Sequence, residues 1–165
     1  MPARSKSFLE AADRVVVGGE YPAIDGGVAV AAEGIENEEV CRLVWGEGVP
    51  PERTVWLGFS QGACLVTEWV ARHPARWGGL VALTGGHIGP PGPIRSIAGA
   101  FEGMPAYFGV AIGDEWVPLE RVQESASMFA RAGAHVHLEI FPSDRHEIRP
   151  DETAAAGRII GALGA

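Results

Sequence analysis

Apolar residues occur in short blocks along most of the chain, and the blocks have two kinds of spacing. Four continuous apolar stretches have the length of buried strands: 54–59 (TVWLGF), 79–85 (GLVALTG), 105–113 (PAYFGVAIG) and 134–142 (AHVHLEIFP). Residues 61–73, 119–132 and 151–163 have the spacing of helices, and Pro74 ends the first of them. Strands that alternate with helices predict βαβ units. The expected fold is therefore α/β, with a parallel sheet of about four strands and helices on both faces.

The first third of the chain has a weaker pattern. Residues 14–17 (RVVV) predict a short fifth strand inside an otherwise irregular segment, 1–24. Asp25 is a suitable N-cap for a helix that extends to about Trp45, although three glycines lower its helix propensity. Residues 46–53 (GEGVPPER) have the Gly and Pro content of a loop. A chain of 165 residues can bury one substantial core, so we expect a single domain over residues 1–165.

The amino-acid composition limits the kinds of molecule that the protein is expected to bind and where in the cell it is expected to act. The formal net charge is −8 and the basic residues are scattered, which argues against nucleic acid and against an anionic membrane surface. No apolar run approaches the ~20 residues of a membrane span, and the first residues, MPARSKSFLE, lack the apolar core of a signal peptide. Cys41 and Cys64 lie in apolar helical patterns and not in metal-ligand spacing. These features predict a cytoplasmic protein with reduced cysteines and with no metal or other cofactor.

One apolar stretch leads into a motif that carries chemistry. Residues 58–62 are Gly-Phe-Ser-Gln-Gly, between the strand predicted at 54–59 and the helix predicted from residue 61. A strand, Gly-x-Ser-x-Gly and a helix in this order are typical of the nucleophile elbow of α/β-hydrolases. A serine in so sharp a turn needs neighbours without Cβ atoms, which Gly58 and Gly62 provide. The alternative is a glycine-rich turn or phosphate loop in which Ser60 only caps the helix.

A nucleophilic serine requires a base and an orienting carboxylate, and α/β-hydrolases have them in the order serine, acid, histidine. Asp114 follows the apolar stretch from residue 105, and His146 lies in the loop after the last predicted strand. The carboxyl ends of parallel strands meet at one edge of a sheet, where open α/β sheets build their sites. Ser60, Asp114 and His146 are therefore the predicted triad, with Glu115 and Asp144 as alternative carboxylates.

The other histidines have simpler explanations. His135 and His137 alternate within a strand and share one face, which favours a structural or solvent-facing role. His73 stands at the end of a helix, where a donor side chain is favourable. His87 lies in the loop after residues 79–85, near the expected mouth of the site, and is a candidate to contact substrate.

Four blocks of this sequence resemble the carboxylesterase/phospholipase family of α/β-hydrolases, which includes the acyl-protein thioesterases. They are GVPPERTVWLGFSQG, LVALTGGHIGPPG, GDEWVPLERVQESASMF and FPSDRHEI, and the likeness extends from about Ser5 to the end. The resemblance implies Ser60 as nucleophile, Asp114 as acid, His146 as base and the Gln61 backbone N–H as an oxyanion donor. Glu115 and Trp116 depart from the family's Asp-Pro-x-Val-Pro block, which leaves the shape of the acyl pocket open.

The sequence differs from the family most at its front. Family members begin with two or three strands and a His-Gly-x-Gly loop that supplies a second oxyanion N–H, and no such loop occurs here. The chain is therefore expected to start about a third of the way into the family's fold. Loss of one oxyanion donor typically lowers kcat by about 10²- to 10³-fold. The Gly18-Gly19 turn is a candidate to replace it.

Missing front strands would also turn the stretch 54–59 into an edge strand, and nothing in its sequence protects such an edge. The edge is expected to pair with Val15–Val17 or with the same strand of a second subunit. A homodimer is favoured, because four strands make a thin core and Trp45, Trp56 and Trp69 need burial.

These features together predict a serine hydrolase that cleaves carboxylic esters or thioesters of small to medium apolar acyl groups. Trp116, His87 and the loop 85–95 are expected to flank the substrate. Amide or lactone hydrolysis would use the same residues and stays open. The alternative from another class is a catalytically weak or inactive hydrolase remnant that serves as a binding or oligomerisation module.

Overall fold

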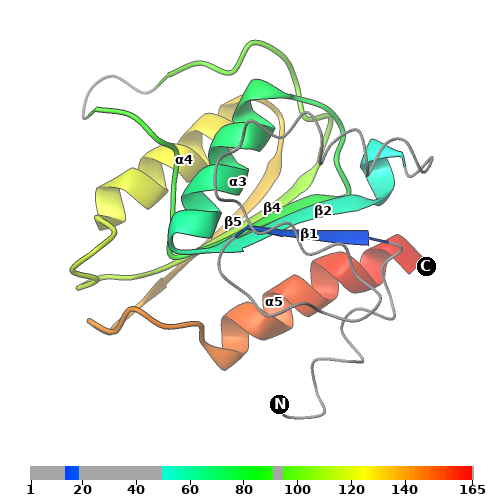
Figure 1. Ribbon diagram of the computed structural model, residues 1–165. Helices are drawn as coiled ribbons and strands as arrows, with labels where there is room; N and C mark the ends of the chain where they lie inside the picture. The colour runs from blue at the N-terminus through cyan, green and yellow to red at the C-terminus, as the bar shows by residue number, and fades with distance from the viewer. Residues whose placement is uncertain (1–13, 19–49, 91–94, 165) are drawn as a thin grey trace.

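The computed structural model describes residues 14–18, 50–90 and 95–164 of the chain. Five parallel strands form one sheet in the order of the sequence (Figure 1). The strands are β1 (Arg14–Gly18), β2 (Thr54–Phe59), β3 (Gly79–Leu83), β4 (Pro105–Ala111) and β5 (His135–Phe141). The four strands expected from the apolar stretches are therefore present, together with the short fifth strand.

Helices cover both faces of the sheet, as predicted. Figure 1 shows α3 (Gln61–Arg72) and α4 (Leu119–Arg131) on one face and α5 (Pro150–Gly161) on the other. Short 3-10 turns at Pro51–Arg53 and Ala162–Gly164 complete the described elements. Each crossover between parallel strands requires a return path. Helix α3 supplies it between β2 and β3, and α4 supplies it between β4 and β5. The predicted helix from Asp25 to about Trp45 lies outside the described residues.

Two apolar layers follow from the alternation of side chains along the strands. On the face of α3 and α4, the indole rings of Trp69 and Trp77 lie 5.7 and 5.3 Å from that of Trp56, measured between ring centroids. On the opposite face, Val55 belongs to a cluster with Ala155 and Ile160 of α5. Adjacent residues of β2 therefore enter different layers, which explains why apolar residues follow one another along this strand instead of alternating with polar ones.

Strand β2 is not at the edge of the sheet. It pairs with β3 on one side and with β1 on the other, in parallel register from Arg14 opposite Thr54 to Gly18 opposite Gly58. Of the two expected ways to cover β2, pairing with Val15–Val17 is the one present. The favoured option, pairing of β2 with the same strand of a second subunit, is therefore wrong for this edge. The predicted homodimer loses that basis and stays untested.

The parallel arrangement decides where a site can form. All five strands end at the same edge of the sheet, so the loops after β2, β3, β4 and β5 leave it side by side.

Within the described residues, no helix is long and apolar enough to cross a membrane.

Candidate active site

Ser60 occupies a strained turn between β2 and α3. Its φ of 53° and ψ of −119° lie in a region that L-residues rarely adopt. The Ser60 N–H donates to the Leu83 carbonyl at 2.9 Å, and the Cys64 N–H donates to the Ser60 carbonyl at 3.1 Å. A Cβ at Gly58 would clash with the backbone of Gly62 and Ala63. The missing side chain of Gly58 therefore permits the close approach of strand and helix that the turn needs.

A continuous chain of hydrogen bonds joins the three predicted triad residues. His146 Nε2 lies 2.8 Å from Ser60 Oγ, and His146 Nδ1 lies 2.8 Å from Asp114 Oδ2. The three side chains come from the loops after β2, β4 and β5, whose carboxyl ends share one edge. The Phe59 ring packs against the imidazole with 5.0 Å between the ring centroids. The structure therefore brings together residues that are up to 86 positions apart in the sequence.

The Asp114 carboxylate is buried, and both of its oxygens have hydrogen-bond partners. Its side chain has no exposed area, whereas the His146 side chain is 20% exposed. Its Oδ1 atom accepts the N–H groups of Trp116 and Val117, both at 2.9 Å. Burial acts to raise the pKa of Asp114, but these two donors and the His146 ring outweigh it and hold the pKa below its usual value. Asp114 is thus an ionised acceptor that faces the imidazole.

The alternative site residues do not reach this chain of bonds. Glu115 and Asp144 are exposed, while Asp114 holds the imidazole. His73 Nδ1 lies 2.9 Å from the Trp69 carbonyl, and its ring stacks on the Trp69 ring. His135 and His137 are exposed on β5, the latter with its ring stacked on Tyr107. Their geometry agrees with the structural and solvent-facing roles expected from their positions.

Two further predicted residues flank the serine and the acid. Gln61 is the first residue of α3, and a backbone N–H at this position has no partner within the helix. Trp116 follows Asp114 by two residues and has 71% of its surface exposed. Both lie beside the proposed reacting groups. Their roles as oxyanion donor and substrate contact remain predictions.

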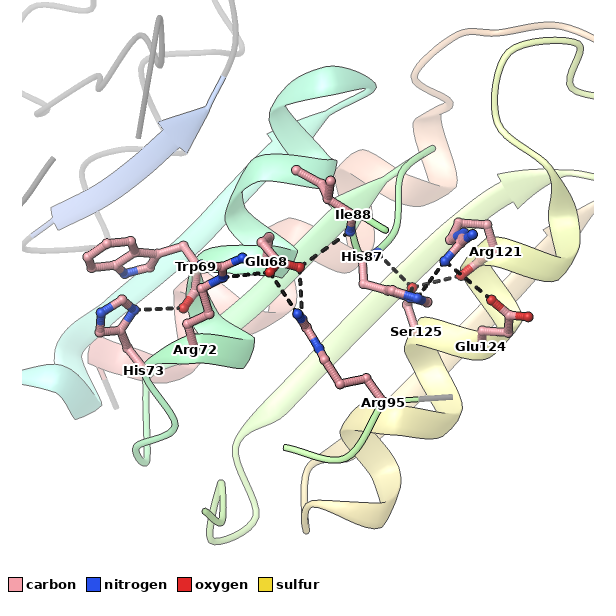
Figure 2. Close-up of polar contacts among 10 residues, drawn as sticks. All are labelled: Glu68, Trp69, Arg72, His73, His87, Ile88, Arg95, Arg121, Glu124 and Ser125. Carbon is pink, nitrogen blue, oxygen red and sulfur yellow. Dashed lines mark hydrogen bonds and ion pairs between the residues drawn. The ribbon is translucent and has the colours of Figure 1, made fainter. Parts of the chain in front are cut away.

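His87 forms hydrogen bonds with side chains of helix α4. Figure 2 shows its ring between Ser125 and Arg121. The His87 N–H donates to Ser125 Oγ at 2.8 Å, Nδ1 lies 2.9 Å from the same oxygen, and Nε2 faces the Arg121 guanidinium. Because a guanidinium can only donate, Nε2 must be the acceptor and Nδ1 must carry the proton. Burial and the Arg121 charge both lower the pKa of His87, which keeps the ring neutral. The side chain therefore anchors the loop after β3, and its predicted contact with substrate is untested.

Glu68 anchors the same loop to helix α3. Its carboxylate accepts hydrogen bonds from Nη1 and Nη2 of Arg95, at 3.0 and 2.8 Å, and from Nε of Arg72 at 2.6 Å (Figure 2). It also accepts the Ile88 N–H at 3.4 Å. Burial acts to raise the pKa of Glu68, but the two arginines outweigh it and the pKa is lowered. The loop after β3 is thus held from both flanking helices, one of which begins at the elbow.

Two residues beside the elbow were missed by the sequence patterns. Thr84 is fully buried at the end of β3, has a φ of 53°, and donates its N–H to the Gly109 carbonyl at 2.8 Å. A positive φ is a true outlier for a β-branched residue. A Cβ at Gly85 would clash with Ala63 and lie 2.8 Å from the Ser60 carbonyl. Only the pair of glycines after Thr84 could have indicated this turn.

Among the described residues, no three histidine, cysteine or carboxylate side chains are grouped in a way that could hold a metal ion. Cys64 is a half-buried free thiol, and Cys41 lies outside the described residues.

The chain belongs to the phospholipase/carboxylesterase family, whose model matches residues 31–162. This confirms the family that the four sequence blocks resemble. No curated protein matches the chain.

Solved structures share the fold. A phospholipase/carboxylesterase from Dyadobacter fermentans has a TM-score of 0.73 and 26% identity, and the match covers 91% of this chain and 90% of that one. SOBER1 from Arabidopsis thaliana has a TM-score of 0.63 and 22% identity, over 76% of this chain and 60% of that chain. A carboxylesterase from Mesorhizobium loti has a TM-score of 0.57 and 23% identity, over 73% and 55%. The chain thus spans little more than half the length of the last two proteins.

Proposed function

We propose that this protein is a serine hydrolase that cleaves carboxylic esters or thioesters with Ser60 as nucleophile, His146 as base and Asp114 as orienting acid. The observation that carries the proposal is the continuous line of 2.8 Å contacts from Ser60 Oγ through the imidazole to Asp114 Oδ2. Family membership supports the same reaction class. Ester cleavage by this machinery requires no metal or organic cofactor.

In the proposed reaction, Ser60 Oγ attacks the carbonyl carbon while His146 Nε2 takes the hydroxyl proton. The tetrahedral intermediate collapses to an acyl-serine, and the leaving alcohol or thiol takes the proton from Nε2. A water molecule then repeats the sequence, releasing the acid and restoring the serine. Throughout the reaction, Asp114 Oδ2 accepts a hydrogen bond from the N–H at His146 Nδ1, which holds the required tautomer and stabilises the imidazolium.

The oxyanion would be stabilised at the amino end of α3. The Gln61 N–H is proposed as one donor, because it lies next to Ser60 and at the positive end of the helix dipole. The second donor is proposed to come from Gly18 or from Gly19, which lies outside the described residues. Strand β1 ends at Gly18 directly opposite Gly58, two residues before the nucleophile, which supports this source.

Apolar side chains around the triad support a preference for small to medium apolar acyl groups. Ile112 and Trp116 flank Asp114, and Ile148 follows His146 by two residues. All three are exposed, with 62%, 71% and 40% of their surface accessible. Large exposed apolar side chains gathered on the loops of a site are typical of a binding surface for an apolar group.

The proposal is tested by labelling the intact protein with a fluorophosphonate and measuring its mass. Ser60 Oγ should displace fluoride and form one covalent adduct per chain, and the Ser60→Ala variant should form none. Activated serines react because the base removes their proton, so labelling reports the Ser60–His146 pair without requiring the natural substrate. An unlabelled but folded wild-type protein would contradict the proposal and favour a binding or oligomerisation module.

A further inference from the structure

The loop that carries His146 is held by the side chain of Arg149. Its Nη2 donates to the Arg145 carbonyl at 2.9 Å, and its Nη1 donates to the Glu147 carbonyl at 3.4 Å. These carbonyls belong to the residues directly before and after His146. A guanidinium is planar and rigid, so it fixes the positions of both carbonyls relative to one another. It therefore constrains the backbone from which the imidazole extends.

Arg149 is itself held by two elements, β5 and α5. Its guanidinium lies over the Phe141 ring, with 4.7 Å from the carbon to the ring centroid, and Phe141 is the last residue of β5. Its backbone N–H donates to Glu152 Oε2 at 2.8 Å in the first turn of α5. The Arg149 side chain is only 12% exposed, and that of Glu152 is fully buried. The loop is thus tied to the strand before it and to the helix after it.

We propose that Arg149 is a positioning residue for His146 in the hydrolase reaction, an inference that rests on the proposed function. The imidazole must meet Ser60 Oγ and Asp114 Oδ2 simultaneously, both at 2.8 Å. A shift of its backbone that shortens one contact lengthens the other. Misplacement by 1 Å can cost about 10²-fold in rate. Arg149 acts through the loop and does not contact the reacting atoms.

The chain offers a matched control in the same loop. Arg145 pairs through its Nε with Glu147 at 3.4 Å, but both side chains are exposed, at 74% and 41%. Such surface pairs contribute little to stability. Replacing Arg145 removes a positive charge from the loop without removing the donors that bind its carbonyls.

The test compares Arg149→Met with Arg145→Met in steady-state hydrolysis of a chromogenic ester. Arg149→Met should lower kcat by about 10- to 10²-fold with KM nearly unchanged, whereas Arg145→Met should leave both close to wild type. Unfolding midpoints of both variants, measured in urea, show what fraction is folded under the assay conditions. In Arg149→Ala, added guanidinium at concentrations well below denaturing should restore part of kcat, and sodium chloride at equal ionic strength should not.

Three results would overturn the proposal: equal kcat in the two methionine variants, a loss that appears in KM alone, or no rescue by guanidinium. Failure of the proposed function looks different, because the wild-type protein would then be neither labelled at Ser60 nor active. In that case the downfield NMR signal of the His146 Nδ1 proton, assigned by its absence in His146→Gln, still reports the ring. It should be present in wild type and lost in Arg149→Met, and an unchanged signal contradicts the positioning role.

Discussion

At the scale of single residues, the two carboxylate oxygens of Asp114 have separate tasks. Oδ1 accepts the N–H groups of Trp116 and Val117, and Oδ2 faces His146 Nδ1. An asparagine can keep the first set of bonds through its carbonyl oxygen. Its NH2 group would then donate toward Nδ1 and stabilise the tautomer in which Nε2 carries the proton. That imidazole cannot accept the serine proton.

The Asp114→Asn variant is therefore expected to fold normally and to lose about 10⁴-fold in kcat. Steady-state hydrolysis of a chromogenic ester measures the loss, and thermal unfolding checks the fold. Glu115→Gln is the control, because Glu115 is exposed next to Asp114 and is expected to leave kcat unchanged. Comparable rates for Asp114→Asn and wild type would show that this carboxylate does not orient the base.

The candidate triad could be predicted from sequence because each member follows an apolar stretch and the order is fixed in α/β-hydrolases. The contacts of His87, Glu68 and Arg149 could not. Glu68 and Arg95 are 27 residues apart, and only the packing of the loop after β3 against α3 brings them together. Only the pairing of Arg149 with Glu152 has a local signal in the sequence, Pro at the first helical position and Glu two residues later.

At the scale of elements, the loop after β3 depends on the ionised form of Glu68. The pKa of Glu68 is lowered in the folded protein, despite its burial, by Arg95 and Arg72. A carboxylate of this kind stabilises the fold at pH values above its unfolded pKa, and the contribution disappears as the pH falls through the folded pKa. Glutamine keeps the shape of the side chain but cannot form the ion pairs.

We expect Glu68→Gln to lower the free energy of unfolding at neutral pH, and the difference from wild type to shrink in acid. Urea unfolding at about pH 7 and about pH 3 measures both values. Glu147→Gln removes an exposed ion pair with Arg145 and should change stability by less than about 1 kcal/mol at either pH. A difference between Glu68→Gln and wild type that does not vary with pH would mean that the charge of Glu68 contributes nothing.

The ends of the elements show what an apolar pattern cannot resolve. The strand predicted to continue to residue 85 ends at Leu83, because Thr84 turns to a φ of 53° and Gly85 packs on the elbow. The last helix begins at Pro150, one residue before the predicted start. Apolar runs therefore predicted which elements exist, whereas backbone turns set by contacts across the sheet decide where they end.

At the scale of the whole molecule, the sheet is completed within the chain by a strand of five residues. Strand β1 pairs with β2 along its whole length and lies at the margin of the sheet (Figure 1). The sequence pattern RVVV was too short to distinguish pairing with β2 from pairing between two copies. Pairing within one chain has the cost of closing the loop between β1 and β2, whereas pairing between two copies has the cost of association. The periodicity of the sequence carries no information about which cost is smaller.

Removal of β1 should therefore convert β2 into the unprotected edge that its sequence predicted. A variant that lacks residues 1–18 exposes the N–H and C=O groups of Thr54–Phe59, and none of these residues is charged. Unpaired apolar strands associate with one another. We expect this variant to form dimers or larger species whose proportion rises with concentration, measured by size exclusion with light scattering. The full chain should show no association that depends on β2. If the shortened variant remains monomeric at every concentration, β1 does not protect this edge, and a dimer of the full chain would have to form through another surface.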